Sequence, residues 1–278
     1  MAQRFRSRRI SAFHVAVIGL ALCLLAACGT ARGRQEAVAA AATKAPRLNT
    51  FSFEMTQEVI YPDFLPVTYE MTGKYVYPDR VWTDITTHVG PDVRTSFTVI
   101  RFGKGYYLRI PDEVRILLPG TREWLAGKVD ELERSRFLGL FPREAQDITQ
   151  TLSLLHDASE SINRPDHTAI EKKALNYVSH YKFQFDGEKL TDSAAMGRHG
   201  NFEAGGGEIW VGVDDLVRQL HFVLFGPARF GGAVRVDIKA NITDHNADLT
   251  FRVPRQEKVT SFEEFKEAYP KAATGVPL

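Results

Sequence analysis

The feature that most constrains the fold of this chain is an alternation of apolar and polar side chains. It is clearest between Ala233 and Ile242, where an apolar set (Val234, Val236, Ile238, Ala240, Ile242) alternates with a polar set (Arg235, Asp237, Lys239, Asn241). Successive side chains of a β-strand point to opposite faces, so this period of two predicts a strand with one buried and one exposed face.

The same period recurs along most of the chain. Five successive strands are expected first: one beginning at Phe51, then Val67–Tyr77, Val81–Val89, Arg94–Phe102 and, after the turn Gly103-Lys104-Gly105, Tyr106–Ile110. Six more are expected at Ile170–Leu175, Val178–Asp186, Glu208–Val213, Val217–Phe225, Ala233–Ile242 and Asp248–Val253, and Gly205-Gly206-Gly207 is interpreted as a turn. Short strands between glycine-containing turns predict an antiparallel sheet, and the first five strands are expected to form a meander.

Helical patterns are fewer. Helices are predicted over Asp130–Leu138, Arg143–Ile162 and Lys189–Met196. A last helix is expected over Ser261–Tyr269, because Ser261 followed three residues later by Glu264 has the pattern of a capping box. The fold class that follows is α+β, mainly β, with one domain over residues 48–278.

The first 28 residues have the order of a bacterial export signal. Four arginines lie among residues 4–9, residues 15–27 carry no charge, and Leu25-Ala26-Ala27-Cys28 resembles a lipobox. An uncharged run of this length is too short for a bilayer core, which needs about 20 residues, but it suits a signal peptide. We therefore predict that residues 1–27 are a signal peptide, and that Cys28 is lipidated and anchors the protein at the extracytoplasmic face of the cell membrane. The alternatives are an ordinary signal peptide with a stray cysteine, and an N-terminal anchor helix.

Residues 28–47 are expected to be the lipidated cysteine and a flexible tether. They are rich in Ala, Thr, Gly and charge, and a short helix around residues 36–43 would have no apolar face to bury. The first 27 residues hold four of the 35 basic side chains and none of the 34 acidic ones, so the remainder carries a small negative charge. This balance gives no reason to expect a nucleic-acid partner.

Residues that carry chemistry are sparse. The chain has no nucleophile elbow, zinc-protease motif, phosphate loop or dinucleotide fingerprint. Of the two cysteines, Cys23 would be removed with the signal peptide and Cys28 would be blocked by lipid. Asp244-His245-Asn246 is interpreted as a turn, with a calcium loop as the alternative. We predict no enzymatic activity, no cofactor and no metal site.

Large apolar side chains are concentrated on the expected strands. They include Phe51, Phe53, Met55, Tyr69, Met71, Tyr75, Tyr77, Trp82, Trp210 and Phe222. One interpretation is a filled core between a sheet and its helices. The other is that the sheet and the helices leave space between them, so that part of this surface lines a ligand cavity. Composition does not separate the two.

A family resemblance bears on this choice. Beside Cys28 it rests on short segments in a fixed order: Met71-Thr72-Gly73-Lys74-Tyr75, Arg101-Phe102-Gly103-Lys104-Gly105-Tyr106-Tyr107-Leu108, Ser179-His180-Tyr181-Lys182-Phe183, Ile209-Trp210-Val211 and Ile242-Thr243-Asp244-His245-Asn246. In these, the mature chain resembles the actinobacterial LppX, LprA, LprF and LprG group of lipid-binding lipoproteins and, more distantly, the LolA and LolB carriers. Residues 122–143 and 197–207 are longer than this resemblance leads one to expect.

The resemblance implies a curved antiparallel sheet, a half-barrel, wrapped around a few helices with an apolar cavity. Such a protein would bind acyl chains of lipids or lipoglycans, carry them within the cell envelope as a monomer, and perform no covalent chemistry. The residues expected to line the cavity are Phe51, Phe53, Met55, Tyr69, Met71, Tyr75, Trp210, Phe222, Val234, Val236 and Ile238. The alternative is a surface sensor or interaction module of the same fold, without lipid cargo, that acts through an envelope protein partner.

Overall fold

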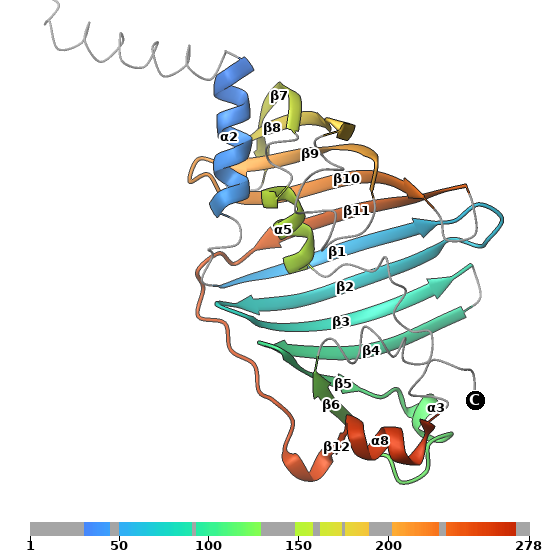
Figure 1. Ribbon diagram of the computed structural model, residues 1–278. Coiled ribbons are helices and arrows are strands. Elements are labelled where there is room, and N and C mark those ends of the chain that lie inside the picture. Colours follow the sequence, from blue (N-terminus) through green and yellow to red (C-terminus); the bar gives the residue numbers. More distant parts are fainter. Residues whose placement is uncertain are drawn as a thin grey trace, which may run out of the picture.

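A computed structural model describes residues 31–44, 50–90, 93–128, 148–157, 162–173, 176–188, 202–227 and 232–270. Its main feature is one twelve-stranded, open and curved sheet (Figure 1). The strands are β1 (Thr50–Ile60), β2 (Val67–Val76), β3 (Arg80–Val89), β4 (Val93–Phe102), β5 (Gly105–Arg109), β6 (Trp124–Lys128), β7 (Ile162–Lys173), β8 (Asn176–Phe185), β9 (Ala204–Gly212), β10 (Val217–Pro227), β11 (Ala233–Thr243) and β12 (Val259–Ser261). The helices among these residues are α2 (Ala31–Lys44), α3 (Asp112–Arg115), α5 (Ile148–Asp157) and α8 (Phe262–Ala268), with a 3₁₀ turn η4 at Gln256–Lys258.

The strands lie in the order β12-β6-β5-β4-β3-β2-β1-β11-β10-β9-β8-β7. Neighbouring strands are antiparallel, except that β12 pairs with β6 in parallel. The expected meander of the first five strands is confirmed, and so is the mainly β, α+β fold class. The alternation also predicted which face of β11 is buried, because Val234, Val236, Ile238, Ala240 and Ile242 are all at most 5% exposed.

The core consists of two apolar clusters on one side of this sheet, which we call the inner face. The larger cluster joins α2 and α5 to the middle strands, and the smaller joins α8 to β4, β5 and β6. The opposite side, the outer face, carries the polar set of the alternation. No helix among the described residues is long and apolar enough to cross a membrane.

The capping box of the C-terminal helix is confirmed. The Ser261 hydroxyl accepts a hydrogen bond from the Glu264 amide (3.2 Å), and the Glu264 carboxylate accepts one from the Ser261 amide (2.9 Å). The same contact lowers the pKa of Glu264, because the Ser261 amide favours the charged carboxylate.

The segment expected to be a tether differs from the prediction. Residues 31–44 form α2, which buries Val38 and Ala41 completely and lies against β7 and α5. Two small apolar residues three positions apart form one helix face, and the surrounding alanines favour the helix. Lys44 ends the helix with an ion pair to Asp215 (2.7 Å). Residues 1–30, with the predicted signal peptide and Cys28, lie outside the described residues.

Three further expectations were wrong in detail. Gly205-Gly206-Gly207 is not a turn but part of β9, and residues 248–253 form no strand. The predicted helix 143–162 is helical over Ile148–Asp157 in its described part, and Ile162 already belongs to β7. The predicted helices at 130–138 and 189–196 lie outside the described residues.

Topology explains the missing last strand. β11 lies between β1 and β10 and is hydrogen-bonded to both. The segment after it therefore has no free strand edge beside β11 to pair with. The chain instead turns at Asp244 and Asn246, both at positive φ, and the Asn246 amide donates to the Thr50 carbonyl (2.8 Å). The turn predicted at Asp244-His245-Asn246 is confirmed.

Candidate functional site

The inner face holds ten of the eleven residues expected to line a cavity. Each is at most 6% exposed: Phe51, Phe53, Met55, Tyr69, Met71, Tyr75, Phe222, Val234, Val236 and Ile238. Strand register brings them side by side. Met55 lies opposite Met71 on β2 and Ala240 on β11, and Val236 lies between Val59 of β1 and Leu224 of β10. The alternation thus predicted one continuous apolar surface correctly, whereas its use as a cavity stays a prediction.

Aromatic rings form much of this surface. The rings of Phe51 and Tyr75 stack with centroids 4.8 Å apart, and the ring of Phe222 meets those of Phe183 (5.9 Å) and Phe185 (6.2 Å) edge to face. Offset and edge-to-face pairs each add about 0.5–1.5 kcal/mol beyond burial. These ring pairs fix the orientation of the aromatic side chains on the inner face.

Two glycines make room for these rings. A β-carbon on Gly207 would lie 2.5 Å from the Phe222 ring and 2.4 Å from the His221 carbonyl oxygen. A β-carbon on Gly73 would lie 2.6 Å from the Phe53 ring. The glycines of β9 are therefore strand residues over which large side chains lie, which is why their interpretation as a turn failed.

Helix α5 lies on the inner face (Figure 1). Its residues Ile148, Leu152, Leu154 and Leu155 are buried in the larger cluster. The Thr151 hydroxyl contacts the sulfur of Met55 (3.8 Å), and the guanidinium of Arg101 donates to the Thr149 hydroxyl. These contacts place α5 directly over the centre of the predicted cavity residues.

The apolar surface is wider than α5. It runs over six neighbouring strands, from β2 through β1, β11, β10 and β9 to β8, which corresponds to about 24 Å at the usual strand spacing. A ten-residue helix is about 15 Å long and about 10 Å across. Among the described elements, α5 and one face of α2 lie on this surface, and every side chain of the larger cluster is at most 7% exposed.

Polar groups are few on the inner face. Gln57 is completely buried beside Ile238 and Tyr69. The hydroxyl of Tyr75 donates to the Pro78 carbonyl (2.9 Å), and burial raises the pKa of Tyr75. Among the described residues, no three His, Cys, Asp or Glu side chains are placed to hold a metal ion. The chemistry that this surface offers is apolar contact.

Sequence reasoning missed the contribution of β8 and, apart from Phe222, that of β10. Tyr181, Phe183 and Phe185 alternate along β8 and are buried in the same cluster, as are Leu220 and Leu224 of β10. Their alternation was visible in the sequence, but the residues were used only to predict strands.

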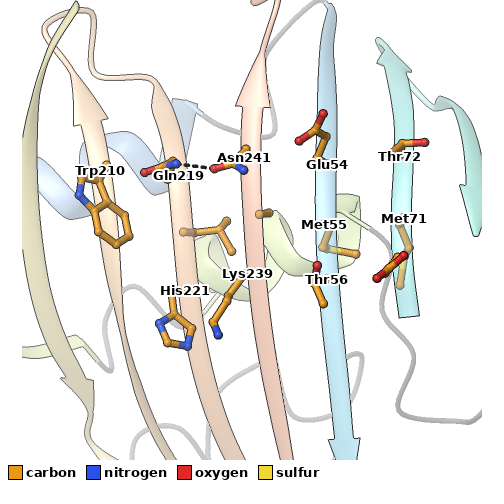
Figure 2. Close-up of a pocket in the computed structure, with 13 residues that line it drawn as sticks. Glu54, Met55, Thr56, Met71, Thr72, Trp210, Gln219, His221, Lys239 and Asn241 are labelled. Carbon is orange, nitrogen blue, oxygen red and sulfur yellow. Dashed lines mark hydrogen bonds between the residues drawn. The ribbon is translucent and has the colours of Figure 1, made fainter. Parts of the chain in front are cut away.

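Trp210, the eleventh predicted residue, lies on the outer face. Its neighbours Ile209 and Val211 are buried on the inner face, so Trp210 necessarily points the other way. There it stands at one end of an open depression of about 520 Å³ (Figure 2). The depression is lined mainly by polar side chains of β1, β2, β10 and β11, which include Glu54, Gln219, Lys239 and Asn241.

Comparison with known proteins found matches among solved structures. No protein-family model matches the chain, and no curated protein matches it in sequence. Among solved structures, the Mycobacterium tuberculosis lipoprotein LppX matches with a TM-score of 0.46 and 12% identity, over 80% of this chain and 99% of that chain. LprF from Mycobacterium bovis matches with a TM-score of 0.44 and 8% identity, over 80% and 96%.

A LolA-superfamily protein from Nitrosomonas europaea matches with a TM-score of 0.31 and 8% identity, over 81% of this chain and 97% of that chain. These proteins belong to the groups that the sequence resembles. At such identities the likeness concerns the course of the chain alone, so ligand and site have to be inferred from this chain's own residues.

Proposed function

We propose that the protein binds acyl chains of lipids or lipoglycans between the inner face and α5, and carries them within the cell envelope. The observation that supports this is the width of the apolar surface relative to the helix that lies on it. Six strands contribute large apolar side chains, whereas α5 presents one face of ten residues. A surface of this kind accepts a long hydrocarbon without specific polar contacts.

The free energy available is sufficient for such a ligand. Each methylene moved from water to an apolar surface contributes about 0.8 kcal/mol. Ten buried methylenes would contribute about 8 kcal/mol, from which the cost of ordering the chain and of moving protein groups is subtracted. Stacked rings and the two methionines Met55 and Met71 suit a chain of variable length, because thioethers adapt their shape to what they contact.

Entry of a chain requires α5 to move, since the residues beneath it are buried. The helix is held largely by apolar contacts of Ile148, Leu152 and Leu155, beside the Arg101–Thr149 hydrogen bond and the Thr151–Met55 contact described above. An acyl chain that takes the place of the α5 side chains on the sheet replaces their apolar contacts with apolar contacts of its own. Displacement of α5 is therefore the step that we assign to loading.

We also propose that the protein acts at the extracytoplasmic face of the cell membrane, through a lipid on Cys28. The support is the order of basic segment, uncharged segment and Leu25-Ala26-Ala27-Cys28. Several acyl chains on one residue give a stable anchor, whereas one chain is marginal. No covalent chemistry is assigned to the protein.

The second candidate is an interaction module without cargo. Complete burial of Phe222, Val236 and Ile238 favours it, because a filled core has the same appearance. The partner would then be an envelope protein, and the inner face would serve stability alone.

Photolabelling separates the two. The full chain is incubated with palmitic acid that carries a diazirine near its methyl end, irradiated, digested and mapped by mass spectrometry. We expect label in peptides of β1, β11 and α5, and none around Phe262 and Phe265, whose equally apolar cluster serves as the internal control. Absence of label from all peptides, or equal label in both clusters, would favour the interaction module.

A further inference from the structure

A row of polar side chains crosses the outer face in line with Trp210. The strand register places Thr72 of β2 beside Glu54 of β1, Glu54 beside Asn241 of β11, Asn241 beside Gln219 of β10, and Gln219 beside Trp210 of β9. All five line the depression described above, and Figure 2 shows them in this order across the strands. Four strand spacings separate the ends of the row, which is about 19 Å.

The indole of Trp210 is fixed in one orientation. The His180 ring stacks on one of its faces, with centroids 4.2 Å apart and an interplanar angle of 9°. His180 is itself held by Glu208 (2.9 Å), and Glu208 by Lys182 (2.8 Å). Burial raises the pKa of Glu208, but the hydrogen bonds from Lys182 and His180 together lower it by more. The pKa of Glu208 is therefore below its usual value.

His180 thus covers one face of the indole, and Trp210 is among the residues that line the depression. A β-bulge lies next to it: β10 has one extra residue, Arg218, between the pairs Val217–Val211 and Gln219–Trp210. Bulges redirect the side chains beside them and are frequent near binding sites. The Arg218 guanidinium is engaged by Asp214 (2.6 Å) and His245 (3.0 Å), which holds it in this local arrangement.

The row offers several hydrogen-bonding side chains, one of them the Glu54 carboxylate, beside the aromatic ring of Trp210. Asn241 and Gln219 are hydrogen-bonded to each other through their amides, which sets the orientation of both. Within the part of the chain that the structure describes, the exposed Glu54 carboxylate and Thr72 hydroxyl have no hydrogen bond or ion pair. Carboxylate, amide and hydroxyl oxygens accept bonds from hydroxyl groups, and the indole face suits the C–H groups of a sugar ring.

Other ligand classes fit less well. An acyl chain would leave the amides and carboxylates of the row unpaired on desolvation. An anionic ligand would be repelled by the Glu54 carboxylate in the row and by the Glu70 carboxylate near it on β2. Lys239, two residues from Asn241 on β11, also lines the depression but lies outside the row. Nucleic acid is excluded by the same carboxylates.

We propose that this row is a binding site for a neutral, linear oligosaccharide that lies across β9, β10, β11, β1 and β2, with one sugar ring on Trp210. The site is on the face opposite to the proposed acyl-chain surface, and does not depend on it. A protein with both would hold a glycan outside the sheet and hydrocarbon inside it.

The test is titration of the full chain, in a detergent without a sugar headgroup, with cellotetraose, maltotetraose, mannotetraose and chitotetraose. Binding is followed by calorimetry and by indole fluorescence. At least one tetrasaccharide should bind saturably at millimolar or lower concentration. Trp210→Ala should weaken this binding about tenfold or more, as truncation of an aromatic residue that carries much of the binding energy does.

The matched control is Trp82→Ala. Trp82 lies on the same outer face, on β3 opposite Lys74, and does not line the depression. This variant should bind the sugar as the wild type does, and Asn241→Leu should weaken binding without changing the fold by circular dichroism. Both Trp variants should retain the bound acyl chain of the wild type.

Three results would overturn the proposal: no saturable binding of any of the four sugars, equal binding by the wild type and Trp210→Ala, or binding of an anionic tetrasaccharide such as tetragalacturonate alone. A wild-type protein that binds sugar but no acyl chain would count against the proposed function and not against the sugar site. Failure of the one proposal is therefore distinguishable from failure of the other.

Discussion

Replacing Phe222 by alanine should make the lipid-free protein less stable and more responsive to fatty acid. The ring is completely buried, and meets Phe183 and Phe185 edge to face above Gly207. Burial of such a side chain is worth about 1.5–3 kcal/mol, and two ring pairs add about 1–3 kcal/mol. The sum agrees with the usual cost of about 3–5 kcal/mol for Phe→Ala in a core. For a domain of this size, the midpoint should fall by roughly 10 °C.

The space left by the ring then becomes part of the acyl-chain surface. Fatty acid at a hundred times its Kd stabilises a protein by about 2.7 kcal/mol, and the gain should be larger in Phe222→Ala than in the wild type. The matched control is Phe265→Ala, which removes a ring that is 1% exposed from the smaller cluster under α8. It should lose similar stability, while its gain from fatty acid equals that of the wild type.

The assay is thermal unfolding of delipidated full chain by circular dichroism, with and without palmitic acid. A loss below about 1 kcal/mol in Phe222→Ala would show that the ring is not packed as described. Equal gains from palmitic acid in Phe222→Ala and Phe265→Ala would refute the assignment of this space to the ligand.

Three further predictions concern helix α5, the half-buried His245 and the lipid anchor. A reducible cross-link between Met55→Cys and Thr151→Cys, made with a short bifunctional methanethiosulfonate because the contact involves the far end of Met55, should hold α5 on the sheet and stop palmitic acid uptake until a reductant is added. Uptake in the cross-linked form would contradict loading beneath α5, and the single variants are controls. Burial, and then the charge of Arg218, lower the pKa of His245, so its contribution to stability is complete above its usual pKa of 6.5 and is lost as the pH falls below it. His245→Gln should therefore lose less stability than the wild type in urea unfolding between pH 7 and pH 5, and parallel losses would contradict this. Cys28→Ala should prevent lipidation and leave uncleaved precursor, as measured by intact mass, and normal maturation would refute the lipid anchor.

Period-two alternation predicted most of the sheet because each buried strand face needs apolar residues at every second position. It placed Val236 and Met55 on one surface, although they are far apart in the sequence and belong to neighbouring strands. It did not supply the strand order. Nothing in the residues around Ala233 indicates that β11 pairs with β1, since that pairing depends on how the whole chain closes.

The errors have specific physical causes. Trp210 was grouped with the cavity residues by size, but a shift of one position along a strand reverses the face, and its neighbours Ile209 and Val211 had already fixed the inner one. Gly207 has the composition of a turn, yet its lack of a side chain serves the ring of Phe222 from the next strand. Residues 31–44 carry only one apolar side chain larger than alanine, Val38, so their sequence does not indicate a packed helix. In the structure, Val38 and Ala41 are nevertheless enough to pack α2 into the larger cluster beside β7 and α5.

The central claim is that hydrocarbon occupies the inner face beneath α5. The most direct measurement is the number of acyl chains released per protein when the purified full chain is extracted with organic solvent and analysed by mass spectrometry. Acyl chains bound covalently near Cys28 remain with the protein under these conditions and are counted separately after hydrolysis. We predict a near-stoichiometric extractable lipid, which is lost when the reducible cross-link between Met55→Cys and Thr151→Cys is formed before exposure to lipid. Protein free of extractable lipid after purification, which also takes up none from vesicles of its own membrane lipids, would contradict the claim.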